Sequence, residues 1–252
     1  MSDSRPISPA PIKPRCILLD IEGTIAPVSF VHEVLFPFAR ARLSSHLAAH
    51  WDEPAVREVR TQIERDANAS TLAQSAMVDH LLGLMDRDAK ATGLKALQGL
   101  IWEGGYRDGS LRSPLFPDVP PALRRWHAAG INLRIYSSGS IAAQKLFLSH
   151  TEHGDLTPLL SGYYDTTTGP KREAESYRRI ATAIARDPNI SAIGRQTEIP
   201  AGSILFISDI VEELNAAAIA GLQTRLALRP GNAPVAPHAH TAIPTFDSLF
   251  SA

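Results

Sequence analysis

Four short runs of apolar residues constrain the fold of this chain more than any other feature of its sequence. Each run is followed by turn-forming residues, and most are then followed by the apolar spacing of a helix. This alternation is typical of an α/β domain whose strands form a buried parallel sheet. The expected strands are 16–19, 133–136, 204–207 and 225–228, and the expected helices are 121–129, 141–149, 173–186 and 211–220.

Residues from about 29 to 109 follow a different pattern. Apolar residues recur there with helical spacing at Phe30, Val31, Val34, Leu35 and Phe38, and later at Val78, Leu81, Leu82 and Met85. We expect Pro37 to kink the first of these helices or to mark its boundary. The pattern predicts a helical unit, 29–109, inserted into an α/β domain formed by 15–28 and 110–252.

The composition is that of a globular protein. The 252 residues include 44% hydrophobic and 20% charged residues, enough for a sizeable core. A formal net charge of -1 argues against nucleic acid or a membrane surface as a partner. No apolar run has the length of a membrane span, and residues 1–14 read as a disordered leader rather than a secretory signal. The single cysteine, Cys16, cannot form an internal disulfide. We expect a cytoplasmic monomer that acts on a small molecule.

Polar side chains follow three of the expected strands, at the edge where open parallel sheets bind ligands. Asp20 and Glu22 follow the first strand, Ser137 and Ser138 the second and Asp209 the third, and Lys171 stands just before a helix. Mg²⁺ typically takes one or two carboxylates plus a phosphate, and an aspartate can attack phosphorus. A lysine offsets the charge of the transferred group, and the backbone N–H groups of a Gly-Thr turn can hold phosphate oxygens. Together these residues predict a phosphoryl-transfer site.

Each of these features also has an ordinary structural explanation. The stretch DIEGT could be a plain turn, and Lys171 could be a solvated surface residue. Ser138 or Ser140 could cap the following helix, and Asp209 could cap a later one. The occurrence of all four features in order favours the site. The sequence has no glycine-rich nucleotide motif and no G-x-S-x-G elbow, and its scattered histidines are interpreted as loop residues rather than metal ligands.

The ordered features resemble the haloacid-dehalogenase superfamily of phosphatases, and the inserted helical unit resembles the cap domain of that superfamily. The superfamily usually has Asp-x-Asp in its first motif, whereas this chain has Asp20-Ile21-Glu22. The chain is more closely similar to the enolase-phosphatase (acireductone synthase) family of methionine salvage, from about residue 17 to 232. The stretches that carry this resemblance are DIEGT, FVHEVLFP, IWEGGYRDG, FPDVPPAL, IYSSGSIAAQKLF, ESYRRIA and RPGN.

The resemblance implies a haloacid-dehalogenase-like Rossmannoid core and an enzyme that uses Mg²⁺. Such an enzyme would convert 2,3-diketo-5-methylthiopentyl-1-phosphate into the acireductone 1,2-dihydroxy-3-keto-5-methylthiopentene and phosphate. The implied metal ligands are Asp20, Glu22 (through its backbone carbonyl) and Asp209, the implied substrate-binding residues are Ser137, Ser138 and Lys171, and Asp20 is also the implied nucleophile. The chain departs from the expected pattern at Pro170, which removes a backbone donor beside the lysine, at Arg112 and at Asn215. Glu213 is a further candidate for orienting the metal shell.

Two alternatives to this function stay open. The first is a phosphatase of the same superfamily that acts on another small phosphomonoester. The second is a catalytically silent binding scaffold on the same fold. If the chain is an enolase-phosphatase, we expect Glu22 to act beside Asp20 as a catalytic residue and to move the carbon-bound proton.

Overall fold

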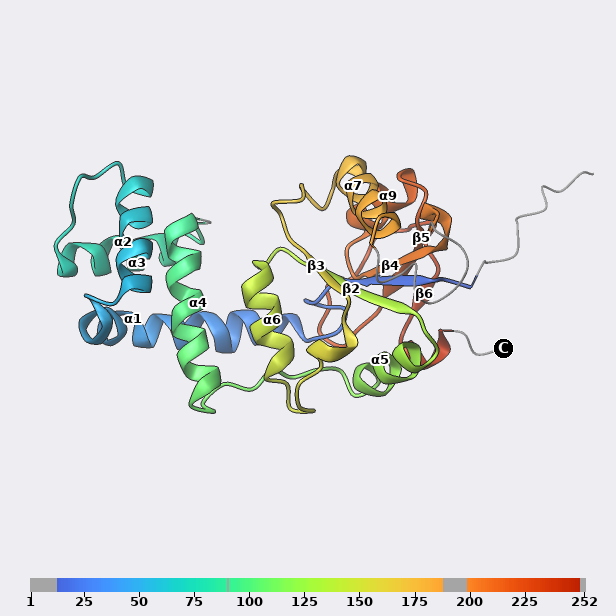
Figure 1. Ribbon diagram of the computed structural model, residues 1–252, viewed down its shortest axis with the longest axis horizontal. Coiled ribbons are helices and arrows are strands. Elements are labelled where there is room, and N and C mark those ends of the chain that lie inside the picture. Colours follow the sequence, from blue (N-terminus) through green and yellow to red (C-terminus); the bar gives the residue numbers. More distant parts are fainter. Residues whose placement is uncertain (1–12, 90, 188–198, 250–252) are drawn as a thin grey trace, which may run out of the picture. The chain divides into compact units, whose positions relative to one another are not determined.

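The computed structural model describes residues 13–89, 91–187 and 199–249, and Figure 1 shows their helices and strands. The chain divides into two compact units. The first comprises Met1–Pro27, Leu115–Gln144 and Asp155–Ala252, and the second comprises Val28–Pro114 and Lys145–Gly154. Most of the expected leader at 1–14 lies outside the described residues.

The first unit is built on a parallel sheet, which in the described part of the chain has six strands in the order β3-β2-β1-β4-β5-β6. The strands are β1 (Cys16–Leu19), β2 (Asn132–Tyr136), β3 (Gly162–Tyr164), β4 (Ile204–Ser208), β5 (Gln223–Ala227) and β6 (Ala242–Ile243). All neighbouring strands pair in parallel. The predicted α/β class with a parallel sheet is confirmed.

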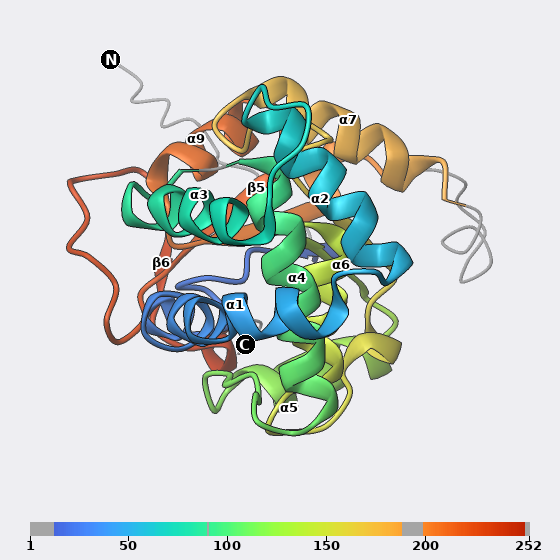
Figure 2. The ribbon, with the colours of Figure 1, turned by 90° about the vertical axis from the view of Figure 1, so that its left-hand side faces the viewer.

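Helices cover both faces of this sheet. They are α5 (Val119–Ala128), α7 (Ala174–Ala185) and α9 (Val211–Ile219). Helix α6 (Ile141–Ser149) begins in the first unit and ends in the second. Figures 1 and 2 show α7 and α9 on one face and α5 on the opposite face. Strands β1, β2 and β4 are buried along their whole length, as expected for a parallel sheet covered on both sides.

The register of the central strands brings the expected site residues to one edge. Leu19 in β1 is aligned with Ile135 in β2 and with Ile207 in β4. The three strands therefore end within one residue of each other at the carboxyl edge of the sheet. Asp20 directly follows β1, and Asp209 directly follows β4.

The C-terminal segment packs on the first unit. Phe246, in the short 3-10 turn η4 (Phe246–Ser248), is fully buried, and its ring centroid lies 5.2 Å from that of Trp126 in α5. Its N–H donates to Asp118 Oδ2 at 2.6 Å. Arg229 Nη1 donates to both carboxylate oxygens of Asp118, at 2.9 and 2.8 Å. Asp118, directly before α5, thus holds both the Phe246 backbone and the buried Arg229.

Helices make up the regular structure of the second unit's described residues, apart from isolated β-bridges of Thr151 with Ser113 and Gly154. The unit contains a π-helical turn η1 (Phe30–Leu35) and the helices α1 (Phe36–His50), α2 (Pro54–Asp66), α3 (Gln74–Asp86) and α4 (Thr92–Arg107), seen face-on in Figure 2. Pro37 is the second residue of α1, at the junction where the π-helical turn η1 passes into α1, so it marks an element boundary. The buried face of α3 runs through Met77 and Leu81, whereas Val78 and Leu82 are only half-buried.

The segment Lys145–Gly154 belongs to the helical unit, although the sequence analysis placed it in the α/β part. Its packing gives the reason. The Phe147 ring meets the Phe30 ring edge-on at 5.9 Å, and His150 lies 5.3 Å from the Tyr106 ring. Among the described residues, no helix is both long and apolar enough to cross a membrane.

Candidate active site

Asp20 is the most deeply buried carboxylate at the carboxyl edge of the sheet, with 3% exposure. Its N–H donates to Ile207 O at 3.0 Å, which continues the strand pairing one residue beyond β1. Lys171 Nζ lies 2.7 Å from Asp20 Oδ1. At this distance the two groups form a buried ion pair. The structure thus brings two of the predicted site residues into direct contact.

Lys171 is a buried cation held between two carboxylates. Its Nζ also lies 2.8 Å from Glu213 Oε2, which in turn accepts a hydrogen bond from Ser208 Oγ at 2.9 Å. Burial alone would lower the pKa of Lys171, but the carboxylates of Asp20 and Glu213 outweigh it, so the pKa is raised. The lysine stays protonated, and its interpretation as a solvated surface residue is wrong. Glu213 contacts this lysine, a partner that the sequence did not indicate.

The loop that carries Lys171 is fixed by three hydroxyl groups. Tyr136 Oη donates to Gly169 O at 2.9 Å, Ser176 Oγ donates to Pro170 O at 2.8 Å, and Tyr177 Oη donates to Lys171 O at 2.7 Å. Burial raises the pKa of Tyr177, which keeps its hydroxyl protonated as a donor. Pro170 has no N–H group to donate. The loop is held instead by three hydroxyl groups that donate to its backbone carbonyls.

Asp209 is a half-buried carboxylate close to two others. Its burial and the negative charges of Asp20 and Glu22 raise the pKa of Asp209 to about 7. The first position of α9 is preceded by Ile210, so Asp209 is not the residue that caps this helix. An accumulation of carboxylates of this kind favours a cation between them.

Glu22, Ser137 and Ser138 lie beside this group. Ser138 Oγ is 3.5 Å from Glu22 Oε2, at the limit of a hydrogen bond, and Ser137 is buried with its Oγ 3.4 Å from Gly139 N. The cap of α6 comes from Ser140, whose Oγ accepts from Ala143 N at 3.3 Å. Ser137 and Ser138 are thus not needed to cap this helix. Of the two serines that could have capped it, Ser138 and Ser140, it is Ser140 that does so.

The turn after β1 packs closely against Asp209. Gly23 has a left-handed φ of +69°, and a Cβ at this position would lie 2.2 Å from Asp209 Oδ2. The N–H groups of Gly23 and Thr24 donate within the turn, to Ala26 O at 2.8 Å and to Ile21 O at 3.2 Å. Both N–H groups are therefore already used within the turn and do not serve as phosphate donors.

Two residues of the RPGN stretch hold the same turn. Arg229 Nε donates to Thr24 O at 2.9 Å, and Asn232 Nδ2 donates to Gly23 O at 2.9 Å. Sequence reasoning quoted this stretch but gave it no role. The chemistry of Arg and Asn was visible in the sequence, but their partners lie more than 200 positions away.

The donors at this edge fit a hard cation. Asp20, Asp209 and the backbone carbonyl of Glu22 offer oxygen ligands, the donor type that Mg²⁺ prefers. Among the described residues no three His, Cys, Asp or Glu side chains form a ready-made metal cluster. Mg²⁺ does not require one, since it typically keeps several waters and takes one or two carboxylates plus a phosphate. Of the histidines, His240 is used in hydrogen bonds to Thr224 and Asn215.

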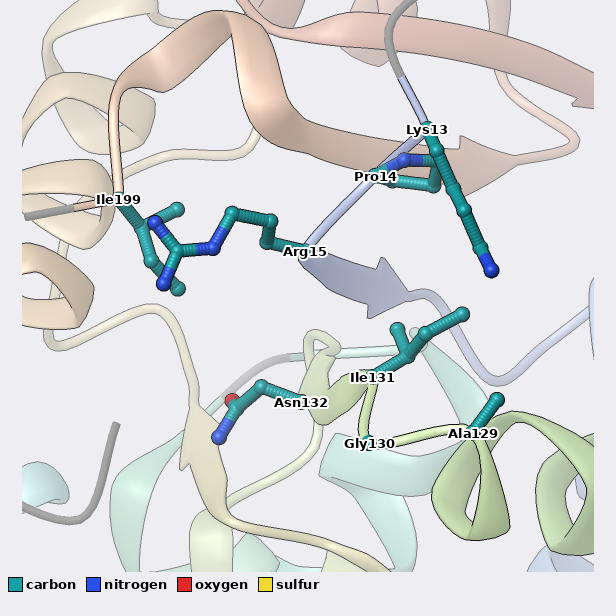
Figure 3. A pocket seen from close by; sticks show the side chains of 8 residues that line it. All are labelled: Lys13, Pro14, Arg15, Ala129, Gly130, Ile131, Asn132 and Ile199. Carbon is teal, nitrogen blue, oxygen red and sulfur yellow. The ribbon is translucent and has the colours of Figure 1, made fainter. Parts of the chain in front are cut away.

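An open pocket of about 280 Å³ lies at the opposite, amino end of the sheet (Figure 3). It is lined by Lys13, Pro14, Arg15, Ala129, Gly130, Ile131, Asn132 and Ile199. In Figure 3 the Arg15 side chain points toward Ile199. None of the predicted site residues lines this pocket, so it is not part of the candidate active site.

The carboxyl edge of the parallel sheet carries Asp20, Lys171 and Asp209, and a helical unit is inserted into the chain. This combination defines a class of hydrolases. The family model described as haloacid dehalogenase-like hydrolase matches residues 14–221, and the chain belongs to this family. It is 46% identical over 250 residues to the enolase-phosphatase E1 of Synechococcus elongatus, a match that covers 96% of this chain and 100% of that protein. Within the hydrolases the chain thus belongs to the enolase-phosphatase E1 family, which confirms the resemblance inferred from the sequence.

Solved structures share the fold of this chain. The UTR4 protein of Saccharomyces cerevisiae is 32% identical, with a TM-score of 0.76, and the match covers 94% of this chain and 100% of that chain. A magnesium-bound HAD hydrolase of Bacillus subtilis shares the fold, with a TM-score of 0.56 at 16% identity over 95% of this chain and 98% of that chain.

Proposed function

We propose that this protein is a Mg²⁺-dependent enolase-phosphatase. Its substrate would be 2,3-diketo-5-methylthiopentyl-1-phosphate, which it would enolise and then hydrolyse to the acireductone and phosphate. The observation that carries the proposal is the contact of the protonated Lys171 with Asp20 at 2.7 Å, beside Asp209 at the same edge of the sheet. Near-complete coverage of an enolase-phosphatase E1 at 46% identity supports the choice of substrate.

Asp20 is the proposed nucleophile of the phosphatase step. One carboxylate oxygen would attack phosphorus while the bond from phosphorus to the substrate oxygen breaks. This leaves a phosphorylated Asp20 and releases the acireductone, whose freed oxygen takes up a proton from solvent. Water would then cleave the acyl phosphate and restore the carboxylate. Lys171, protonated and directly beside Asp20, would offset the charge of the phosphoryl oxygens during both steps. Ser137 and Ser138 would hold the phosphate oxygens through their hydroxyl groups.

Glu22 is the proposed base of the enolase step. The carbon that bears the phosphate is adjacent to a carbonyl, so its proton is acidic enough for a positioned carboxylate to remove. The side chain of Glu22 has one more methylene than aspartate and reaches further from the turn. Its Oε2 lies near Ser138 Oγ, at the rim of the site rather than in its buried part.

Asp20, Asp209 and the carbonyl of Glu22 are the proposed ligands of Mg²⁺. When bound, the cation would supply positive charge that stabilises the oxyanion of the enolate and the phosphoryl oxygens. The cation would also offset the negative charges of Asp20 and Asp209, since burial and neighbouring carboxylates raise the pKa of Asp209.

A substrate panel tests this function against the nearest alternative. The purified protein, with MgCl₂, should release phosphate from the diketone phosphate with a higher kcat/KM than from sugar phosphates or p-nitrophenyl phosphate. A preference for sugar phosphates would favour a different phosphatase of the same superfamily. No metal-dependent release from any substrate would favour a catalytically silent scaffold.

We also propose that the helical unit contributes the substrate selectivity expected of a cap domain. Replacing residues 29–109 with a short linker should then reduce activity on the diketone phosphate far more than activity on p-nitrophenyl phosphate. Circular dichroism of the shortened protein would establish that the α/β unit still folds. Equal losses on both substrates would assign the helical unit a structural role alone.

A further inference from the structure

Asn232 is oriented by two backbone carbonyls. Its Nδ2 donates to Gly23 O at 2.9 Å and to Ala227 O at 3.4 Å. Both partners are acceptors only, so the amide nitrogen must face them and the amide oxygen must face the other way. The direction of Asn232 Oδ1 is therefore fixed by the hydrogen bonds of the same side chain.

Asn232 Oδ1 is buried and has no hydrogen-bond partner. It lies on the side of the turn where Asp209 lies, because both approach the position that a Cβ on Gly23 would occupy. Asn232 Oδ1 would be 3.0 Å from that Cβ, and Asp209 Oδ2 would be 2.2 Å from it. Two oxygen acceptors thus face one small region, and a buried acceptor without a donor is unfavourable.

The cation already present in the site does not fill this need. The ammonium group of Lys171 lies between Asp20 and Glu213, at 2.7 and 2.8 Å. The N–H groups of Gly23 and Thr24 donate within their own turn. A donor or a positive charge that comes with a ligand would satisfy Asn232 Oδ1 and Asp209 together.

We propose that Asn232 is part of the shell around the cation of this site, and that its Oδ1 accepts a hydrogen bond from the hydration water of that cation. The proposal rests on the proposed Mg²⁺ site. Mg²⁺ gives up its water reluctantly, so residues near its ligands act on the bound waters. Asn232 would then join the RPGN stretch to the DIEGT turn in two ways, by holding Gly23 O and by fixing the hydration of the cation.

Titration calorimetry with MgCl₂ tests this role on four proteins: wild type, Asn232→Leu, Asn232→Asp and Asn215→Leu. Asn232→Leu removes both the oxygen and the donor, and its Kd for Mg²⁺ should rise by about 10- to 100-fold, as for other residues that orient a metal shell. Asn232→Asp keeps an acceptor oxygen but loses the donor to Gly23 O. It should bind Mg²⁺ at least as tightly as wild type, while its melting temperature without metal falls. Asn215, exposed and bonded to His240, is the matched control and should leave Kd unchanged.

If Asn232→Leu and Asn232→Asp weaken Mg²⁺ binding equally, the proposal is overturned. The loss of the hydrogen bond to Gly23 O, which both variants share, would then explain the whole rise in Kd. A Kd for Mg²⁺ of Asn232→Leu within twofold of the wild-type value would also overturn the proposal. A wild-type protein that binds no Mg²⁺ would instead refute the proposed metal site itself.

NMR of the wild-type chain gives a readout that needs no folded variant. On addition of Mg²⁺, the side-chain carbonyl ¹³C resonance of Asn232 should shift and that of Asn215 should not, and an unmoved Asn232 resonance would contradict the proposal.

Discussion

Replacing Gly23 with alanine should disable the site without unfolding the protein. Gly23 has a left-handed φ of +69°, where a side chain adds strain of about 1–2 kcal/mol. The new Cβ would also lie 2.2 Å from Asp209 Oδ2 and 2.6 Å from Asp209 Cγ. The substitution therefore has two separable effects, a backbone strain and a collision with a proposed metal ligand.

The size of the second effect follows from the geometry. Ordinary van der Waals contact with a Cβ begins near 3.4 Å, so the carboxylate of Asp209 must retreat by about 1.2 Å. A misplacement of about 1 Å in a catalytic group costs about 100-fold in rate, which corresponds to about 2.7 kcal/mol of activation free energy. We expect kcat/KM for phosphate release to fall by at least this factor.

Gly109 provides a matched control. Its φ is +80°, and nothing lies within 4 Å of the Cβ that alanine would add. Gly109→Ala should therefore lose a similar amount of stability but keep its activity. The assay is phosphate release with MgCl₂, accompanied by thermal melts of both variants. A folded Gly23→Ala with more than a third of wild-type activity would refute the argument, as would an equal loss of activity in Gly109→Ala.

Two further predictions concern the core of the first unit. Burial raises the pKa of Cys16 from 9.0 to about 12, so between these pH values the unfolded chain loses a proton that the folded chain keeps. The free energy of unfolding should fall by about 1.4 kcal/mol per pH unit above pH 9, and a shallower slope in Cys16→Ala, measured by urea melts, would confirm the cause. Asp118→Asn should destabilise the protein by about 3–5 kcal/mol, because it leaves Arg229 buried without a counter-charge. Asp247→Asn, in the exposed pair with Arg125 at 3.7 Å, should cost less than about 1 kcal/mol, and similar losses in the two variants would contradict this assignment.

The sequence predicted the parts of the fold that rest on local apolar pattern. The strand at 16–19 and the helix at 141–149 have the predicted bounds, because the buried strand is a continuous apolar run and the helix begins directly after the capping residue Ser140. The edge strands β3 and β6 were missed because they have three and two residues, too few for any periodicity. The sequence placed the start of this strand at residue 225, whereas β5 begins at Gln223. Its first two residues are polar, and they form part of the strand because they pair with β4.

At the candidate site, too, features that depend on local sequence were predictable and contacts between distant segments were not. The side chains at strand ends were predictable, since parallel strands deliver them to one edge. The contact of Glu213 with Lys171 and the hydrogen bond from Asn232 to Gly23 were not. Each joins segments that come together only in three dimensions, and Asn232 and Gly23 are 209 positions apart.

The most direct test of the account is the reaction of Asp20→Asn with 2,3-diketo-5-methylthiopentyl-1-phosphate and MgCl₂, followed by ultraviolet absorbance and phosphate release together. If Asp20 is the nucleophile and Glu22 the enolisation base, the variant should still form the enol phosphate. Absorbance should then rise without phosphate release, whereas Glu22→Gln should produce neither from this substrate but keep some hydrolysis of p-nitrophenyl phosphate. Calorimetry must first show that both variants bind Mg²⁺. Accumulation of the enol phosphate by Glu22→Gln, or wild-type phosphate release by Asp20→Asn, would contradict the account.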